Sequence, residues 1–249
     1  LSRQLAHELG FDFEAGGLSL SEHPFTTSFS PLDVRITTRL FEQDLPEGIG
    51  STIHETGHAL YEQGVLSANY GLPAGEAISL GIHESQSRLW ENNIGRSRAF
   101  IRAYLPVFKQ YFPEQLGAIG EEEFYRAFNQ VQPSLIRTAA DEVTYHLHIL
   151  IRTELEKALM EERLSVDELP EAWNQAYQDY LGITPGKPSE GVLQDIHWSH
   201  GAIGYFPTYS LGSFYAAQFY QQAQKAIPDL DAQIEKRNPQ PLLHWLREN

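Results

Sequence analysis

Apolar residues recur every three or four positions along most of this chain, which is the spacing of helices that bury one face. Glycines, prolines and capping residues mark where these periodic stretches end. The pattern therefore predicts a mainly α-helical protein. The expected helices cover residues 1–9, 48–65, 76–93, 97–112, 121–131, 134–160, 165–181, 213–226 and 242–248.

One stretch departs from this helical spacing. Residues 33–39 alternate apolar Val34 and Ile36 with polar neighbours and are rich in β-branched side chains, which predicts a strand. Residues 22–27 are the expected partner strand, while paired glycines mark residues 11–20 as a loop. We therefore expect a small two-stranded β-ribbon beside the helical body.

The helix expected over residues 134–160 carries a polar stripe at the same period as its apolar stripe. An ordinary solvated face is dominated by Lys and Glu, whereas this stripe consists of Arg, Asp, Tyr and His. Such a mixture favours a face that lines a water-filled cleft. A buried ion-pair network without a catalytic role is the alternative. The stripe consists of Arg137, Asp141, Tyr145, His148 and Arg152.

Composition limits the class of protein and its partners. The 249 residues are enough for a substantial core, and 41% hydrophobic and 20% charged residues are ordinary for a soluble globular protein. A net charge of −15 argues against nucleic acid or an anionic membrane as a partner. No apolar run approaches membrane-spanning length and no signal-type segment opens the chain, so a cytoplasmic protein is expected.

The candidate chemistry centres on residues 54–58, His-Glu-Thr-Gly-His. On a helix, positions i and i+4 lie on one face, so His54 and His58 can bind one metal ion, with zinc expected. Glu55 lies where a carboxylate can act as general base on a water that the metal activates. Two surface histidines that happen to fall four positions apart are the alternative.

A catalytic zinc has three protein ligands and one open position. Because the chain has no cysteine, the third ligand should be His, Asp or Glu. The next expected helix offers Glu84 as the first candidate, with Glu76 and Glu91 as alternatives.

Histidines, tyrosines and glycines crowd into residues 191–212, a stretch too broken for one long helix. Its aromatic residues lack a regular core spacing, so a loop that carries function is the favoured interpretation. If the metal-activated water attacks a peptide bond, the reaction also needs hydrogen-bond donors for the oxyanion that develops on the carbonyl oxygen. The candidate donors are His197, His200, Tyr205 and Tyr209.

A substrate carboxylate would need a bidentate arginine. Arg137 is the first choice and Arg35 the second, with Arg152 also in an informative stretch. For each of them, a structural ion pair is the alternative.

Several separate motifs together resemble the carboxypeptidase Taq family of metallocarboxypeptidases. They occur in the family's order across residues 23–198, and the set is far more specific than the metal motif alone. They are His23-Pro24-Phe25, Asp33-Val34-Arg35-Ile36-Thr37, His54-Glu55-Thr56-Gly57-His58, His83-Glu84-Ser85-Gln86, Ile136-Arg137-Thr138-Ala139-Ala140-Asp141 and Gly191-Val192-Leu193-Gln194-Asp195-Ile196-His197-Trp198.

The resemblance implies one zinc or cobalt ion bound by His54, His58 and Glu84, with Glu55 as general base. It also implies a homodimer and a helical gluzincin-type fold, with a deep cleft and a small sheet beside the metal helix. The implied activity is stepwise release of residues, with broad specificity, from peptides with a free C-terminus.

Further site residues follow from the same resemblance. His23 and Asp141 lie in the family's motifs and join the arginines as candidate substrate-binding residues, and Asp141 is a candidate for orienting a ligand histidine. Residues 204–209 look like the tyrosine segment that faces the scissile carbonyl in the wider clan.

Members of the family are typically considerably longer, and this chain matches mainly their C-terminal half. We interpret residues 1–249 as a single metallopeptidase catalytic domain, either a compact variant, a fragment or one of two chains. The predicted function is that of a metal-dependent carboxypeptidase. The rivals are a related helical oligoendopeptidase or dipeptidyl carboxypeptidase, and a truncated, inactive binding subunit.

Overall fold

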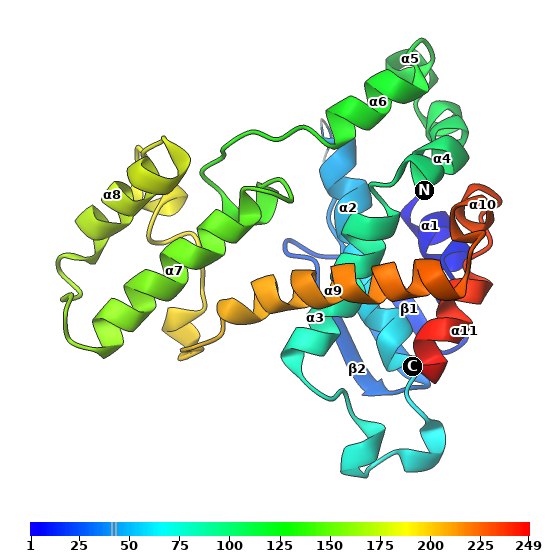
Figure 1. Ribbon diagram of the computed structural model, residues 1–249, viewed down its shortest axis with the longest axis horizontal. Helices are drawn as coiled ribbons and strands as arrows, with labels where there is room; N and C mark the ends of the chain where they lie inside the picture. The colour runs from blue at the N-terminus through cyan, green and yellow to red at the C-terminus, as the bar shows by residue number, and fades with distance from the viewer. Residues whose placement is uncertain (41, 43) are drawn as a thin grey trace. The chain divides into compact units, whose positions relative to one another are not determined.

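The computed structural model is mainly helical with one small sheet, as the apolar periodicity predicts (Figure 1). Among the described residues, none of the helices combines the length and the apolar character that a membrane span requires. The chain divides into two compact units, so a single catalytic domain stays a prediction. The structure describes residues 1–40, 42 and 44–249; the first unit comprises Leu1–Phe128 and Gly212–Asn249, and the second Asn129–Leu211.

The first unit combines helices with a three-stranded sheet whose central strand is β3. β1 (Gly16–Leu20) pairs with β3 (Asp33–Thr38) in parallel, and β2 (Thr26–Ser30) pairs with β3 in the antiparallel sense. The helices are α1 (Ser2–Glu8), α2 (Leu45–Glu62), α3 (Leu80–Arg88), α4 (Arg98–Tyr111), α5 (Pro113–Leu116), α6 (Glu121–Phe128), α10 (Leu230–Glu235), α11 (Gln240–Glu248) and most of α9 (Pro207–Ala226).

Strand β1 corrects the loop expected over residues 11–20. A Cβ atom at Gly16 would meet the carbonyl oxygen of Val34 at 2.0 Å, so only glycine allows this approach to β3. The glycines that indicate a loop in the sequence therefore serve strand pairing. On β3, Val34 and Ile36 are buried with Ala59 of α2, which confirms a small sheet beside the motif helix and enlarges it to three strands.

The motif helix α2 begins at Leu45, earlier than the predicted 48. Asp44 caps it by accepting a hydrogen bond from the backbone N–H of Glu47 at 3.0 Å. Pro46 occupies the first turn, where its missing N–H has no cost. The glycines at 48 and 50 thus lie inside the helix and do not mark its start.

The helix expected over residues 76–93 is shorter at its start and changes type near its end. Ser79 caps α3 by accepting a hydrogen bond from the backbone N–H of Ile82 at 3.2 Å. From Leu89 to Ile94 the helix continues as a π-helical segment. Such wide turns shift the register of the following side chains and are frequent at functional sites.

A single apolar cluster joins the helices of the first unit. Phe100, Tyr104 and Phe108 of α4 stack along one face, and the bounds of α4 agree with the predicted helix over residues 97–112. Ile53 and Leu60 of α2 belong to the same cluster, which anchors the motif helix by its apolar face.

The second unit is built on α7 (Tyr145–Met160) and α8 (Leu169–Leu181), which pack around Trp173 and Tyr177. Ser165 and Glu168, whose spacing is that of a capping box, form one before α8, because the backbone N–H of Ser165 donates to the Glu168 carboxylate at 3.0 Å. Gly182 ends α8 with φ +71°, a conformation that favours glycine.

The single helix expected over residues 134–160 is wrong in its first third. The backbone N–H of Arg137 donates to the side chain of Gln194 at 2.9 Å, so this segment folds onto the loop region instead of continuing a helix. Asp141 then accepts the backbone N–H groups of Val143 and Thr144 and caps the turn into α7.

Residues 191–212 are not one continuous loop. They contain a short 3₁₀ turn at Trp198–His200, and α9 begins at Pro207 and not at 213. Proline is well suited to a first helical turn. Tyr209 therefore lies on a helix, while His197 and Tyr205 precede it.

Candidate metal centre

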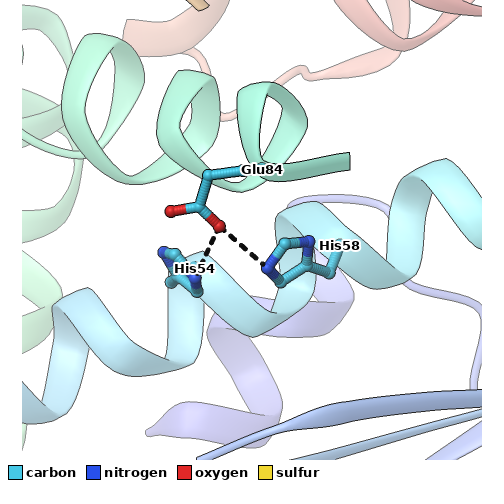
Figure 2. Close-up of side chains that lie close together, drawn as sticks. All are labelled: His54, His58 and Glu84. Atoms are coloured by element: carbon cyan, nitrogen blue, oxygen red, sulfur yellow. Dashed lines mark ion pairs between the residues drawn. The ribbon is translucent and has the colours of Figure 1, made fainter. Parts of the chain in front are cut away.

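Both histidines of the predicted motif lie on one face of α2. His54 and His58 are one helical turn apart, and their ring centroids lie 4.8 Å from each other. Their side chains are mostly buried, with exposed fractions of 19% and 17%. Both point toward Glu84 on α3 (Figure 2).

Glu84, the first-choice third ligand, completes the group. Its Oε2 atom lies 3.7 Å from Nε2 of His54 and 3.5 Å from Nε2 of His58 (Figure 2). The ligand atoms of all three residues lie within 4.8 Å of one another. Ligands about 2 Å from a tetrahedral zinc ion are roughly 3.3 Å apart, so the group fits one such ion. Glu76 is exposed and lies outside this group.

Two glycines allow Glu84 to approach the histidines. A Cβ atom at Gly57, the fourth residue of the motif, would lie 2.7 Å from Cα of Ser87 and 2.8 Å from the carbonyl oxygen of Gln86. A Cβ atom at Gly212 of α9 would lie 2.6 Å from Cγ of Glu84. Gly57 therefore sets the distance between α2 and α3, and Gly212 leaves room for the ligand side chain.

We expect Gly57→Ala to destabilise the protein although alanine favours helices. The added methyl gains up to about 1 kcal/mol of helix propensity, but its collision with the α3 backbone costs roughly 1–3 kcal/mol. Urea denaturation should show a net loss of about 1 kcal/mol in the free energy of unfolding, with reduced zinc binding. Gly81→Ala is the control, since Gly81 also lies in a helix and the nearest atom to its Cβ position would be 3.7 Å away, an ordinary van der Waals contact. Equal stability of the two variants would contradict the close helix approach.

Arg88 and Glu91 support the ligand group from the same side of α3 and its π-helical continuation. Nε of Arg88 donates to Oε1 of Glu84 at 2.8 Å, which leaves Oε2 turned toward the histidines. Nη1 of Arg88 donates to Oε2 of Glu91 at 3.1 Å, and that oxygen lies 2.7 Å from Nδ1 of His54. Glu91 therefore supports His54 and is not a member of the ligand group. The spacing of residues 84, 88 and 91 is the sequence signal for this arrangement.

The charges around the ligand group favour a cation. Burial alone would lower the pKa of His54, but Glu84 and Glu91 outweigh burial and raise that pKa to about 9. Burial acts to raise the pKa of Glu84, yet Arg88 and the two histidines hold it well below its usual range. Burial lowers the pKa of His58, which favours its neutral form. The group therefore attracts positive charge while His58 keeps a lone pair for a metal.

A strand residue holds the carboxylate of Glu55, the predicted base. Glu55 is 6% exposed, and its Oε2 accepts a hydrogen bond from Oγ1 of Thr26 at 2.6 Å. Thr26 is the first residue of β2, so the sheet beside α2 positions this side chain. The sequence predicts this strand over residues 22–27, so β2 begins and ends later than expected, and it carries no signal for this contact between distant segments.

In the second unit, Arg137, Tyr145 and Arg152 of the predicted polar stripe belong to a buried ion-pair network with Asp195. Nε and Nη2 of Arg137 both donate to Oδ1 of Asp195, at 2.9 and 2.8 Å, and Nε of Arg152 donates to Oδ2 at 2.6 Å. Nη1 of Arg137 also donates to the hydroxyl of Tyr145 at 3.2 Å. These are the ion pairs of the alternative interpretation, while the role of Arg137 in substrate binding stays a prediction. Asp195, which joins both arginines, was not among the predicted site residues.

Asp141 has local partners in the second unit. Besides the N–H groups that it caps, its carboxylate accepts the backbone N–H of Gln132 at 3.1 Å. Glu91, and not Asp141, is the carboxylate at Nδ1 of His54.

The structure brings three of the four predicted oxyanion donors together within the second unit. Nε2 of His197 lies 2.8 Å from the hydroxyl of Tyr209. The rings of Tyr205 and Tyr209 meet edge to face with centroids 5.3 Å apart. His200 is exposed.

Two predicted substrate-binding residues lie at exposed positions of the first unit. Arg35 is paired with Asp33 at 2.8 Å, and its side chain is 60% exposed. Nδ1 of His23 lies 2.8 Å from the carbonyl oxygen of Pro24. Their roles in substrate binding stay predictions.

Comparison with known proteins confirms the resemblance. A family model described as carboxypeptidase Taq (M32) metallopeptidase matches residues 1–249. Thermostable carboxypeptidase 1 of Thermus thermophilus is 50% identical over 244 residues, which cover 98% of this chain and 48% of that protein. Carboxypeptidase 1 of Bacillus subtilis is 48% identical over 248 residues, which cover 100% of this chain and 50% of that protein.

A solved structure gives the same result. The M32 carboxypeptidase from Deinococcus radiodurans superimposes with a TM-score of 0.95 at 48% identity, covering 99% of this chain and 50% of that one. The chain thus spans about half the length of the relatives that it matches.

Proposed function

Because this chain belongs to the carboxypeptidase Taq (M32) family of metallopeptidases, we propose that it carries the metal centre of a metal-dependent carboxypeptidase. The observation that carries the proposal is the group of His54, His58 and Glu84, whose ligand atoms fit one divalent ion. The proposed substrate is a peptide with a free C-terminus, cleaved at its last peptide bond with broad specificity. Zinc is the proposed metal and cobalt the alternative, because imidazole and carboxylate ligands suit both.

Glu55 is the proposed proton carrier of the reaction. A zinc ion held by the three ligands would polarise the scissile carbonyl and make water acidic near neutral pH. Glu55 takes the proton of the attacking water and then donates it to the leaving amine. Because Thr26 donates to Oε2 of Glu55, the other carboxylate oxygen is left for this transfer.

The remaining contacts with the substrate fall into two proposed sets. Neutral donors stabilise the oxyanion that develops at the scissile carbonyl. The candidates for this role, among which a His or a Tyr would contact the oxyanion, are His197, His200, Tyr205 and Tyr209. A second set recognises the substrate, chiefly through its terminal carboxylate. Arg137 is the first choice for binding that carboxylate and Arg35 the second, while His23 and Asp141 would contact other groups of the substrate.

A pair of matched peptides tests the proposed function. The zinc-supplemented chain should shorten a peptide with a free C-terminus one residue at a time. The same peptide with an amidated C-terminus should react at least about 30-fold more slowly, since losing one partner of a buried charge pair costs about 2 kcal/mol or more. Mass spectrometry of the products reads both results.

Other product patterns would identify a rival function. Equal cleavage of both peptides would indicate an endopeptidase, and release of dipeptides would indicate a dipeptidyl carboxypeptidase. A chain that binds no zinc and cleaves neither peptide would indicate a binding subunit. The homodimer and the cytoplasmic location stay predictions.

A further inference from the structure

His58 is in contact with a second histidine that is not part of the ligand group. Nδ1 of His58 lies 2.6 Å from Nδ1 of His83. On its other side, Nε2 of His83 lies 2.7 Å from Oε1 of Glu62. The side chains of His83 and Glu62 are only 19% and 20% exposed. The three residues therefore form a mostly buried chain of hydrogen bonds that ends on a ligand of the metal centre.

The orientation of His58 decides which of its nitrogens carries the proton. Its Nε2 faces Glu84, so this nitrogen must keep its lone pair to bind a metal. The proton of neutral His58 then lies on Nδ1, which donates to Nδ1 of His83. His83 must accept at Nδ1, and its own proton therefore lies on Nε2, facing Glu62.

We propose that Glu62 and His83 are positioning residues that select the metal-binding tautomer of His58. A carboxylate only accepts hydrogen bonds, so Glu62 keeps the proton of His83 on Nε2. The opposite tautomer of His83 would direct a lone pair at the carboxylate. That tautomer would also place Nδ1–H of His83 directly opposite Nδ1–H of His58. The repulsion would be relieved only if the proton of His58 moved to Nε2, where it would block metal binding.

The chain of hydrogen bonds links both helices of the metal centre. His58 and Glu62 are one turn apart on α2, and His83 reaches between them from α3, directly before Glu84. His54 has the shorter arrangement, in which Glu91 contacts Nδ1 directly. Partners of this kind fix the orientation of ligand histidines, and their loss weakens metal binding about 10- to 100-fold.

Zinc affinity, measured by competition with a chromophoric chelator, tests the inference, which rests on the proposed metal centre but not on peptide hydrolysis. We expect Glu62→Gln to weaken zinc binding about 10-fold, because an amide both donates and accepts and no longer selects one tautomer of His83. His83→Leu removes the acceptor for His58 and should weaken binding about 10- to 100-fold. His83→Asn should restore part of the affinity, since its carbonyl oxygen can accept in place of Nδ1.

Glu123→Gln is the matched control, because Glu123 is exposed on α6 and its loss changes the net charge by the same amount. This control should bind zinc as the unmodified chain does. Zinc affinities of Glu62→Gln and His83→Leu within two-fold of the control would overturn the inference and leave the metal centre standing. Should His83→Leu fail to fold, Glu62→Gln decides alone. An unmodified chain that binds no zinc would overturn the metal centre together with the inference.

Nitrogen-15 NMR of the zinc-loaded chain reads the tautomers directly, and a purely structural role of Glu62 would not change them. The expected protons are on Nδ1 of His58 and on Nε2 of His83. Glu62→Gln should produce a mixture of both His83 tautomers, with the signals assigned through His83→Asn. A proton on Nδ1 of His83 in the unmodified chain would overturn the proposed order.

Discussion

Replacing Glu55 by glutamine should lower kcat by about 1000-fold or more while zinc stays bound. The variant keeps a side chain of the same size, and glutamine can still accept the hydrogen bond from Thr26. It cannot take a proton from water or give one to the leaving amine, and acid–base catalysis of this kind contributes about 100- to 10,000-fold. Peptide hydrolysis and zinc content, measured on the same preparation, check both parts of this prediction.

A control separates loss of the base from a change in charge. Glu123→Gln removes one charge at an exposed position and should keep full activity. If Glu55→Gln retains more than about a tenth of the activity, Glu55 is not the base. If it loses zinc, the carboxylate is part of the metal centre itself.

Glu84→Gln should weaken zinc binding by about 100-fold or more and abolish activity at low zinc concentration. Zinc sites with four protein ligands bind with roughly 10–16 kcal/mol, or about 3 kcal/mol for each ligand. Glutamine keeps the size of the buried side chain and a carbonyl oxygen for Arg88, but it removes the charge that faces the two histidines. Chelator competition measures the affinity, and the thermal shift on adding zinc should shrink in parallel.

Glu76→Gln is the control for this prediction, because the sequence offers Glu76 as one of the alternative third ligands, whereas in the structure its side chain is exposed. It should bind zinc like the unmodified chain. If Glu76→Gln weakens binding as much as Glu84→Gln does, the assignment of the third ligand is wrong.

The helices with regular apolar spacing and local caps could be predicted closely from the sequence. The predicted helix over residues 97–112 became α4, Arg98–Tyr111, because Ser97 caps it and its aromatic residues repeat at helical spacing. The capping box at residues 165–168 and Gly182 likewise mark the approach and the end of α8. In each case the deciding contacts lie within a few residues.

The failures have a common cause in contacts between distant residues. Residues 134–144 have apolar spacing that suits a helix, but Gln194 accepts the N–H of Arg137 from 57 positions away. The glycines at 16 and 17 indicate a loop, yet Gly16 is the residue that lets β1 lie against β3. Neither partner can be identified from the local pattern.

The residues of the candidate site divide in the same way, into those that local spacing predicts and those that contacts between distant segments decide. The sequence alone determined the pair His54 and His58 and the adjacent Glu55, because helical spacing places side chains one turn apart on the same face. For the third metal ligand, the spacing of residues could only rank Glu84 above Glu76 and Glu91. The resemblance to the family then favoured Glu84. The choice of ligand depends on the distance between α2 and α3, which the packing of Gly57 against Ser87 sets.

The tertiary structure alone decided what surrounds the ligands. Thr26 reaches Glu55 from the sheet, Glu91 supports His54 from the π-helical segment, and His83 lies between His58 and Glu62. Local spacing follows from backbone geometry, which every short segment carries in its own sequence. The partners of a buried polar group follow from which segments pack together and exclude water, and this depends on the whole chain.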